Sequence, residues 1–163
     1  MVERPRDAAG RPLNARPRDA LGRPLPPGSQ GVPRIPENLA LSPAESLSYA
    51  QDLLNEGMAF HAHEVLEAAW KSCPEDERPL WQGLAQLAVG LTHIQRGNPT
   101  GAAALLRRGA GHLGEVASPA PYSVDRDGLC SWAAQLIGDL EAAPGIAPTR
   151  LCPALTTPAA ERG

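Results

Sequence analysis

The stretch Leu80–Gln95 contains no Asp, Glu, Lys or Arg, although charged residues make up 20% of the chain. A helix of this length without a full charge is typical of the centre of a bundle, where it is packed on most of its sides. Gly83 and Gly90 fall together on one flank, where they would allow another helix to approach closely. At about 100° per residue, one face collects the large apolar side chains. These are Leu80, Leu84, Leu87, Leu91 and Ile94.

Start and stop signals divide the middle of the chain into short helices. Ser42 and Glu45 form a capping box, and Gly57 and Gly97, which are 40 positions apart, each end a helix. No segment alternates with the period of a strand. We therefore expect an all-α fold over 42–143, namely a compact bundle of about five helices. The helices form tetratricopeptide-like hairpins, in which one helix ends at Gly and the next packs closely against it. The expected helices cover 42–57, 59–72, 79–97, 98–113 and 126–142.

A repeated sequence marks the N-terminal arm, residues 1–41, as a region of different character. Arg4–Leu13 reads RPRDAAGRPL and Arg16–Leu25 reads RPRDALGRPL, so the two copies differ only at Ala9 and Leu21. The prolines of the arm remove hydrogen-bond donors and disfavour helix. The arm is also too poor in apolar residues to offset the entropy of ordering, so we expect it to be disordered or strapped over the domain.

Both ends of the chain lie outside the expected bundle. If the arm is a strap, Leu13 and Leu25 are the side chains expected to hold it. The alternative is a basic arm that contacts nucleic acid, but residues 1–34 carry a net charge of only +4 (seven Arg, two Asp and one Glu) and have no aromatic side chain to stack on bases. We therefore do not expect a nucleic-acid partner. Residues 144–163 have no periodic pattern, and we expect a disordered tail.

A polar cluster is expected where the helices over 59–72 and 79–97 meet. Phe60 lies in the middle of the polar face of the first helix, which suggests that this face is covered. The polar residues of the second helix fall within about 40° of one another. We expect the two sets to meet across a helix–helix contact, with His61 pointing away as surface. The cluster comprises His63, Glu64, Glu67 and Trp70 from the first helix and Gln82, Gln86 and His93 from the second.

Three kinds of chemistry fit this cluster. It can be a hydrogen-bonded network that fixes helix docking or orients a ligand. It can hold a divalent metal (zinc, iron or manganese) through His63, Glu67 and His93, since residues one turn apart can reach one ion. It can perform acid–base catalysis with a buried Glu64 or Glu67 facing a histidine. The Glu-x-x-His order of di-iron bundles and the His-Glu-x-x-His order of zinc proteases are both absent.

Whole-chain features favour a cytoplasmic protein. The N-terminus has no apolar stretch after its charges, and no run approaches the roughly 18 apolar residues of a membrane span. Cys73, Cys130 and Cys152 are too few and too scattered for a disulfide framework or a clustered zinc site. We therefore expect no membrane contact, and a small ligand or a protein as the partner.

Three sequence motifs, which follow one another along the chain, resemble those of the bacterial family catalogued as domain of unknown function 309. They are Phe60–Trp70 (FHAHEVLEAAW), Trp81–Ala88 (WQGLAQLA) and His93–Ala102 (HIQRGNPTGA). The resemblance covers about 43–113 and implies a small all-α fold of helical hairpins, with no established activity or cofactor. The arm is similar to that of high-GC actinobacterial members. His63, Glu64, Glu67, Trp70, Gln82, Gln86 and Asn98 match the family signature by position.

The sequence therefore favours a binding or scaffold module with a fixed His/Glu/Gln cleft. The first alternative is a metal-dependent or acid–base enzyme that uses His63, Glu64, Glu67 and His93. The second is an accessory protein whose basic arm contacts nucleic acid.

Overall fold

The computed structural model describes residues 19, 21, 23, 40–143 and 145–157. The described part forms five α-helices and three short 3-10 helices, with no strand beyond one isolated β-bridge. The expected all-α bundle is therefore confirmed, and the expected helix boundaries hold to within two residues. The helices are α1 (Pro43–Asn55), α2 (Ala59–Ser72), α3 (Arg78–Gln95), α4 (Pro99–Gly114) and α5 (Arg126–Ala142).

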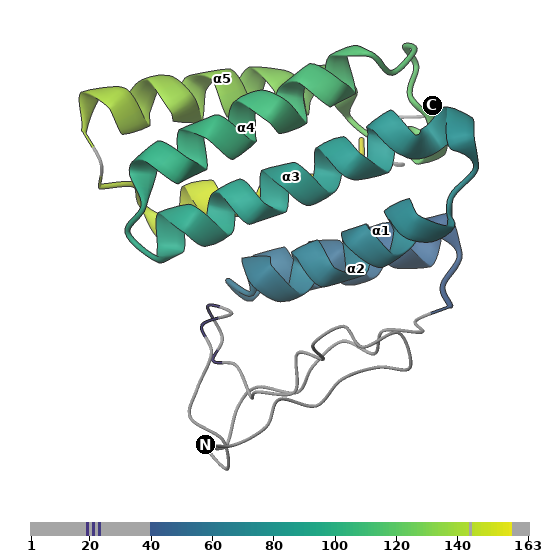
Figure 1. The fold of residues 1–163 in the computed structure, drawn as a ribbon, viewed down its shortest axis with the longest axis horizontal. Helices are drawn as coiled ribbons and strands as arrows, with labels where there is room; N and C mark the ends of the chain where they lie inside the picture. The colour runs from purple at the N-terminus through teal and green to yellow at the C-terminus, as the bar shows by residue number, and fades with distance from the viewer. Residues whose placement is uncertain (1–18, 20, 22, 24–39, 144, 158–163) are drawn as a thin grey trace, which may run out of the picture.

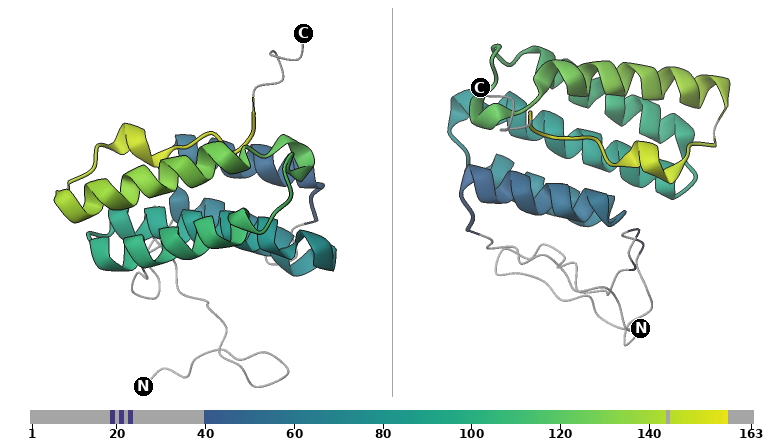
Figure 2. Two further views of the ribbon diagram at one scale, coloured as in Figure 1. Left: turned by 90° about the horizontal axis from the view of Figure 1, so that it is seen from above. Right: turned by 180° about the vertical axis from the view of Figure 1, so that it is seen from behind.

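The helices are arranged in two layers. In one layer α2, α3 and α4 run side by side in chain order, with α3 between the other two (Figure 1). The other layer holds α1 and α5, and the chain that follows α5 runs between these two helices (Figure 2). The position of α3 in the centre explains why its sequence carries no full charge from Leu80 to Gln95. Among the described residues, no helix combines the length and the apolar character that crossing a membrane requires.

Local signals set the helix ends. The Ser42 side chain accepts from the Glu45 N–H at 3.1 Å, and the Glu45 carboxylate accepts from the Ser42 N–H at 3.1 Å, which completes the expected capping box. Gly57 and Gly97 both adopt a φ of 77°, in the left-handed region that favours glycine. The two hairpins α1–α2 and α3–α4 thus turn in the same way, as the 40-residue spacing predicts.

Glycine brings α3 and α4 into close contact. A Cβ added at Gly83 would lie 2.9 Å from the Gly109 carbonyl oxygen, and one added at Gly109 would lie 2.9 Å from the Gly83 carbonyl oxygen. Gly90 meets Leu106 in the same way, with 3.0 Å to its Cγ. The expected role of Gly83 and Gly90 is therefore confirmed. On the apolar face of α3, Leu80, Leu84, Leu87 and Leu91 are buried and Ile94 is partly buried.

The expectation of a disordered tail is wrong for residues 145–157. Leu155 is only 3% exposed and belongs to the hydrophobic core. Its N–H donates to Gln51 Oε1 on α1 at 2.8 Å, and Gln51 Nε2 donates to the Pro153 carbonyl at 3.0 Å. On the other side, Trp132 Nε1 on α5 donates to the Arg150 carbonyl at 3.1 Å. The segment has no α-helical period because it lies between two helices as a short 3-10 helix, Pro148–Leu151, followed by non-helical chain.

Candidate functional site

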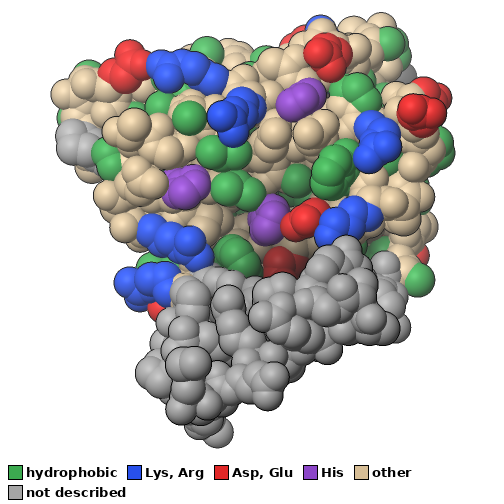
Figure 3. Space-filling model, viewed as in Figure 1, with side chains coloured by type: hydrophobic (Ala, Val, Ile, Leu, Met, Phe, Trp, Pro, Cys, Tyr) green, Lys and Arg blue, Asp and Glu red, His purple; other side chains and the backbone are tan. Residues whose placement is uncertain are grey.

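A stripe of half-buried side chains runs along α2. Phe60, His63, Glu67 and Trp70 recur at steps of three and four residues, so they share one face of the helix. We call these four residues the α2 stripe. They belong to the layer of α2, α3 and α4, whose outer face carries histidine, basic and acidic side chains (Figure 3).

An ion-pair ladder occupies the middle of the α2 stripe. His63 Nε2 donates to Glu67 Oε2 at 3.0 Å, and Lys71 Nζ lies 3.2 Å from Glu67 Oε1. The hydrogen bond from His63, supported by the charge of Lys71, lowers the pKa of Glu67 from 4.5 to about 2. Glu67 is therefore a carboxylate at neutral pH, which does not suit the role of a general acid that the sequence left open for it.

Two arginines from α3 bracket the α2 stripe. The Arg96 guanidinium carbon lies 5.7 Å from the centre of the Phe60 ring, and that of Arg78 lies 5.5 Å from the Trp70 ring. Both distances fit a cation–π contact. Because α2 and α3 are antiparallel neighbours, arginines from the two ends of α3 reach the two ends of the stripe. Sequence analysis did not single out this pairing, which depends on the register of the two helices.

Two nitrogens of the α2 stripe are buried without a hydrogen-bond partner among the described residues. They are His63 Nδ1 and Trp70 Nε1. When His63 is neutral and donates through Nε2, its Nδ1 is an acceptor, whereas the indole N–H of Trp70 is a donor. A buried polar group without a partner costs about 1–3 kcal/mol. The stripe thus contains one buried donor and one buried acceptor that have no partner among the described residues.

The expected pairing between α2 and α3 is wrong for Gln86 and His93. Gln86 Oε1 lies 2.7 Å from His112 Nδ1 on α4, and His93 Nδ1 lies 3.2 Å from Asn98 Nδ2 at the start of α4. Burial, with Arg96 adding its charge, lowers the pKa of His93. Both side chains therefore face α4. Glu64 and Gln82 are half-buried, on α2 and α3 respectively.

His61 is buried, with 1% of its surface exposed, so the expectation that it points away from the domain is wrong. The signal that could have placed it correctly is its spacing: His61 stands one turn before Val65, which is also 1% exposed. His112 was not part of the expected cluster. Its contact with Gln86 requires the α3–α4 packing to be known first.

The metal ligand set expected from the sequence is not assembled. Within the described residues, no three His, Cys, Asp or Glu side chains are grouped so that they could hold one metal ion. His63 and Glu67 are paired with each other, whereas His93 is turned toward Asn98. The expectation that one metal ion is held by His63, Glu67 and His93 is therefore wrong. The helix register pairs His63 with Glu67 and turns His93 toward α4.

An N-terminal segment contacts Arg96, the arginine that lies over Phe60 at one end of the α2 stripe. Arg96 Nε donates to the Leu21 carbonyl oxygen at 3.1 Å, a contact between residues 75 positions apart. Leu21 is half-buried. The expectation of a strap named Leu13 and Leu25, which lie outside the described residues. Leu21 was noted only as the position at which the two repeats differ.

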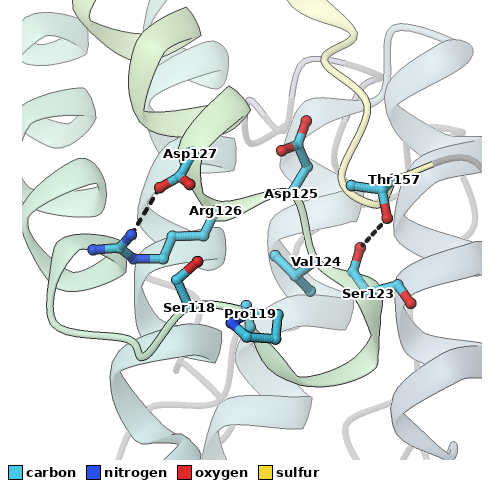
Figure 4. Close-up of a pocket in the computed structure, with 9 residues that line it drawn as sticks. Ser118, Pro119, Ser123, Val124, Asp125, Arg126, Asp127 and Thr157 are labelled. Atoms are coloured by element: carbon cyan, nitrogen blue, oxygen red, sulfur yellow. Dashed lines mark hydrogen bonds and ion pairs between the residues drawn. The ribbon is translucent and has the colours of Figure 1, made fainter.

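A hollow of about 390 Å³ lies elsewhere, where the chain passes from α4 to α5 (Figure 4). Its one basic side chain is Arg126, which is already engaged by the protein. Arg126 donates to the carbonyls of Leu113 at 2.9 Å and Gly114 at 3.0 Å, and pairs with Asp127 at 2.7 Å. Arg126 therefore caps the C-terminus of α4. The hollow is part of the helix connection, and its arginine is already engaged by the protein.

Comparison with known proteins finds similarity for the segment that contains the α2 stripe. Residues 47–105 match the family model described as Domain of unknown function (DUF309). This segment is therefore similar to DUF309 domains. It is also similar to the uncharacterized protein YpuF of Bacillus subtilis (strain 168), with 46% identity over 48 residues. That match covers 29% of this chain and 28% of the relative, so it spans less than a third of either protein.

No solved structure gives a significant match to the chain. The DUF309 segment contains the whole α2 stripe and both bracketing arginines, Arg78 and Arg96. It does not contain Leu21. The contact at Leu21 thus joins the DUF309 segment to a part of the chain outside it.

Proposed function

We propose that the chain is a binding module in which the α2 stripe and Arg96 hold a peptide segment. The observation that carries this proposal is the hydrogen bond from Arg96 Nε to the Leu21 carbonyl, made while the guanidinium lies over Phe60. Arginine suits this task because its fixed fork can donate to a carbonyl while its plane rests on an aromatic ring.

Two further features support a peptide as the ligand. The buried nitrogens His63 Nδ1 and Trp70 Nε1 supply an acceptor and a donor, which match the N–H and C=O groups of a backbone. The side chains of the α2 stripe belong to a helix, so they are held in fixed positions before the ligand binds. Preorganisation of this kind lowers the entropy cost of association.

The test uses two Arg–Asp bonds with the same neighbours. Trypsin cuts after Arg unless Pro follows, so within the repeats it can cut only at Arg6–Asp7 and Arg18–Asp19, both within the sequence RPRDA. Binding of the segment around Leu21 should slow cleavage after Arg18 several-fold relative to cleavage after Arg6. The rates are measured on the intact chain by mass spectrometry under native conditions, where cleavage follows the population of the open form.

Two arginine variants test whether Arg96 protects the Arg18–Asp19 bond from trypsin. Arg96→Met keeps a long apolar stem but removes the donor and the charge, so the two cleavage rates should become equal. Arg108→Met is the matched control, because Arg108 is an exposed α4 arginine and its side chain has no ion pair among the described residues. Equal rates after Arg6 and Arg18 in the unmodified chain would contradict the proposal.

A further inference from the structure

Asp19, Leu21 and Arg23 are joined to one another by hydrogen bonds to the Asp19 carboxylate. Asp19 Oδ1 accepts from the N–H groups of Leu21 at 3.0 Å and Arg23 at 2.9 Å, and Asp19 Oδ2 accepts from Arg23 Nε at 2.8 Å. The Asp19 N–H donates to the Arg23 carbonyl at 3.1 Å. An aspartate that binds the backbone two residues ahead forms an Asx turn. The same carboxylate is neutralised by Arg23, so the turn presents little net charge to its surroundings.

The outer groups of this turn are the ones that reach the domain. The Leu21 carbonyl accepts from Arg96, and Leu21 is half-buried, whereas Arg23 is exposed. The Leu21 carbonyl therefore serves as a backbone acceptor for the domain, whereas the Asp19 carboxylate is engaged by Arg23 within the segment. This arrangement resembles a ligand with a defined contact face more closely than a chain that lies on the surface by chance.

Building on the proposed peptide-binding role, we infer that the α2 stripe and Arg96 recognise an Asp-x-Leu-Gly-Arg turn, of which Asp19–Arg23 is the resident and displaceable copy. The kind of partner that fits is a peptide with an Asx turn that presents a leucine and an outward carbonyl. The chain supplies this turn itself. Among the residues that the structure describes, the contact consists of one side-chain hydrogen bond from an exposed arginine, so it can be exchanged for the same turn on another molecule.

The repeat in the arm provides a natural test of specificity. The first copy, Asp7–Arg11, has the same Asp, Gly and Arg but carries Ala9 at the leucine position. Loss of a half-buried leucine side chain should weaken binding about tenfold. The second copy is therefore the one expected to occupy the site, and the first copy serves as a matched competitor that lacks only the leucine.

The tether gives the resident copy an advantage over a free peptide. A segment on a short flexible linker has an effective concentration on the order of 1 mM at its own site. A free peptide must compete with it, so binding to the unmodified chain should be about tenfold weaker than to a chain whose resident turn has been undone. Asp19→Ala undoes the turn by removing its carboxylate acceptors.

The experiment measures fluorescence polarisation of a dye-labelled peptide, RPRDALGRPL (residues 16–25), titrated with three full-length proteins. Asp19→Ala should bind the peptide about tenfold more tightly than the unmodified chain. Asp7→Ala, the same change in the first copy, should behave like the unmodified chain. In the Asp19→Ala protein, the peptide RPRDAAGRPL (residues 4–13) should bind about tenfold more weakly than RPRDALGRPL, and adding Arg96→Met should abolish binding of both.

Two results would overturn the inference: equal binding of the two peptides, or equal binding of RPRDALGRPL by Asp19→Ala and Asp7→Ala. If the peptide fails in this way while the Arg18–Asp19 bond remains protected and depends on Arg96, the stripe holds the segment without recognising this turn, and the proposed function stands. If the protection is also absent, both proposals fail. Circular dichroism of each variant verifies that the helices are intact.

Discussion

The segments at the two ends of the chain look alike in sequence but are held in different ways. Both are rich in proline, lack a helical period and were expected to lie outside the bundle. At the C-terminal end, Leu155 is 3% exposed and its N–H and C=O groups bond to Gln51 and Asp125. At the N-terminal end, Leu21 is half-buried, and its described contact with the domain is one hydrogen bond from Arg96.

This difference separates a structural segment from an exchangeable one. The C-terminal segment completes the hydrophobic core between α1 and α5, and its removal would expose apolar surface and leave polar groups without partners. The N-terminal contact lies at the surface, where a single hydrogen bond contributes only about 0.5–1.5 kcal/mol. A contact of that strength opens often enough to allow exchange, which is what a binding site requires.

The largest expected effect is the loss of the buried leucine. Leu155→Ala should lower the free energy of unfolding by about 2–5 kcal/mol, because it removes a core side chain and leaves a cavity. Leu21→Ala, the matched change at the other end, should lower it by no more than about 1 kcal/mol, the linkage cost of a contact that is tenfold weaker. Urea denaturation followed by circular dichroism measures both. A similar loss in the two variants would show that the ends are equally integrated.

A smaller effect is expected from the glutamine that joins α1 to the C-terminal segment. Gln51 donates to the Pro153 carbonyl and accepts from the Leu155 N–H, so Gln51→Ala should cost about 1–3 kcal/mol by leaving both groups unpaired. Gln135→Ala on α5 is the control, since Gln135 is exposed. Equal stabilities of the two variants would show that apolar burial alone holds the segment.

The sequence predicted the helices because their signals are local. The capping box at Ser42, the turns at Gly57 and Gly97 and the uncharged length of α3 each act within a few residues of chain. The α3–α4 contact through Gly83 was also predictable, because small residues on one flank allow close approach whatever the partner is. These features do not require the positions of distant segments to be known.

The contacts that define the site were not local and were predicted less well. Gln86 was expected to face α2 but binds His112 on α4, because the rotation of α3 is set by its packing on both neighbours. The Arg96–Leu21 contact closes a loop of 75 residues, and no periodic pattern marks either end of it. The membership of Phe60, His63, Glu67 and Trp70 in one face of α2 was predictable from helical spacing alone.

The surface beside the N-terminal contact should respond to pH through Glu67. Its pKa is lowered to about 2 in the folded chain, so the paired carboxylate stabilises the fold above its ordinary value of 4.5, and this stability is lost as the pH falls from 4.5 toward 2. Because Glu67 is partly exposed, solvent screening reduces the effect to about 0.5–1 kcal/mol. Glu67→Gln should therefore be less stable than the unmodified chain at pH 6, with a difference that shrinks at pH 3.

Urea denaturation at the two pH values measures this change. Glu115→Gln is the control, because Glu115 is an exposed carboxylate with no ion pair among the described residues. Its difference from the unmodified chain should be the same at pH 6 and pH 3. If Glu67→Gln also shows a constant difference, the pair with His63 does not persist in solution, and the stripe is less preorganised than its geometry indicates.

The smallest effect on stability, and the sharpest on binding, is expected at the two arginines of α3. Arg78→Met and Arg96→Met each remove a partly exposed cation–π contact, so each should cost no more than about 0.5–1 kcal/mol in urea denaturation. Trypsin should nevertheless distinguish them. Only Arg96 donates to Leu21, so only Arg96→Met should accelerate cleavage after Arg18. Equal acceleration by Arg78→Met would mean that the N-terminal segment is held along the whole α2 stripe. The N-terminal and C-terminal segments would then differ only in how strongly they bind to the helices.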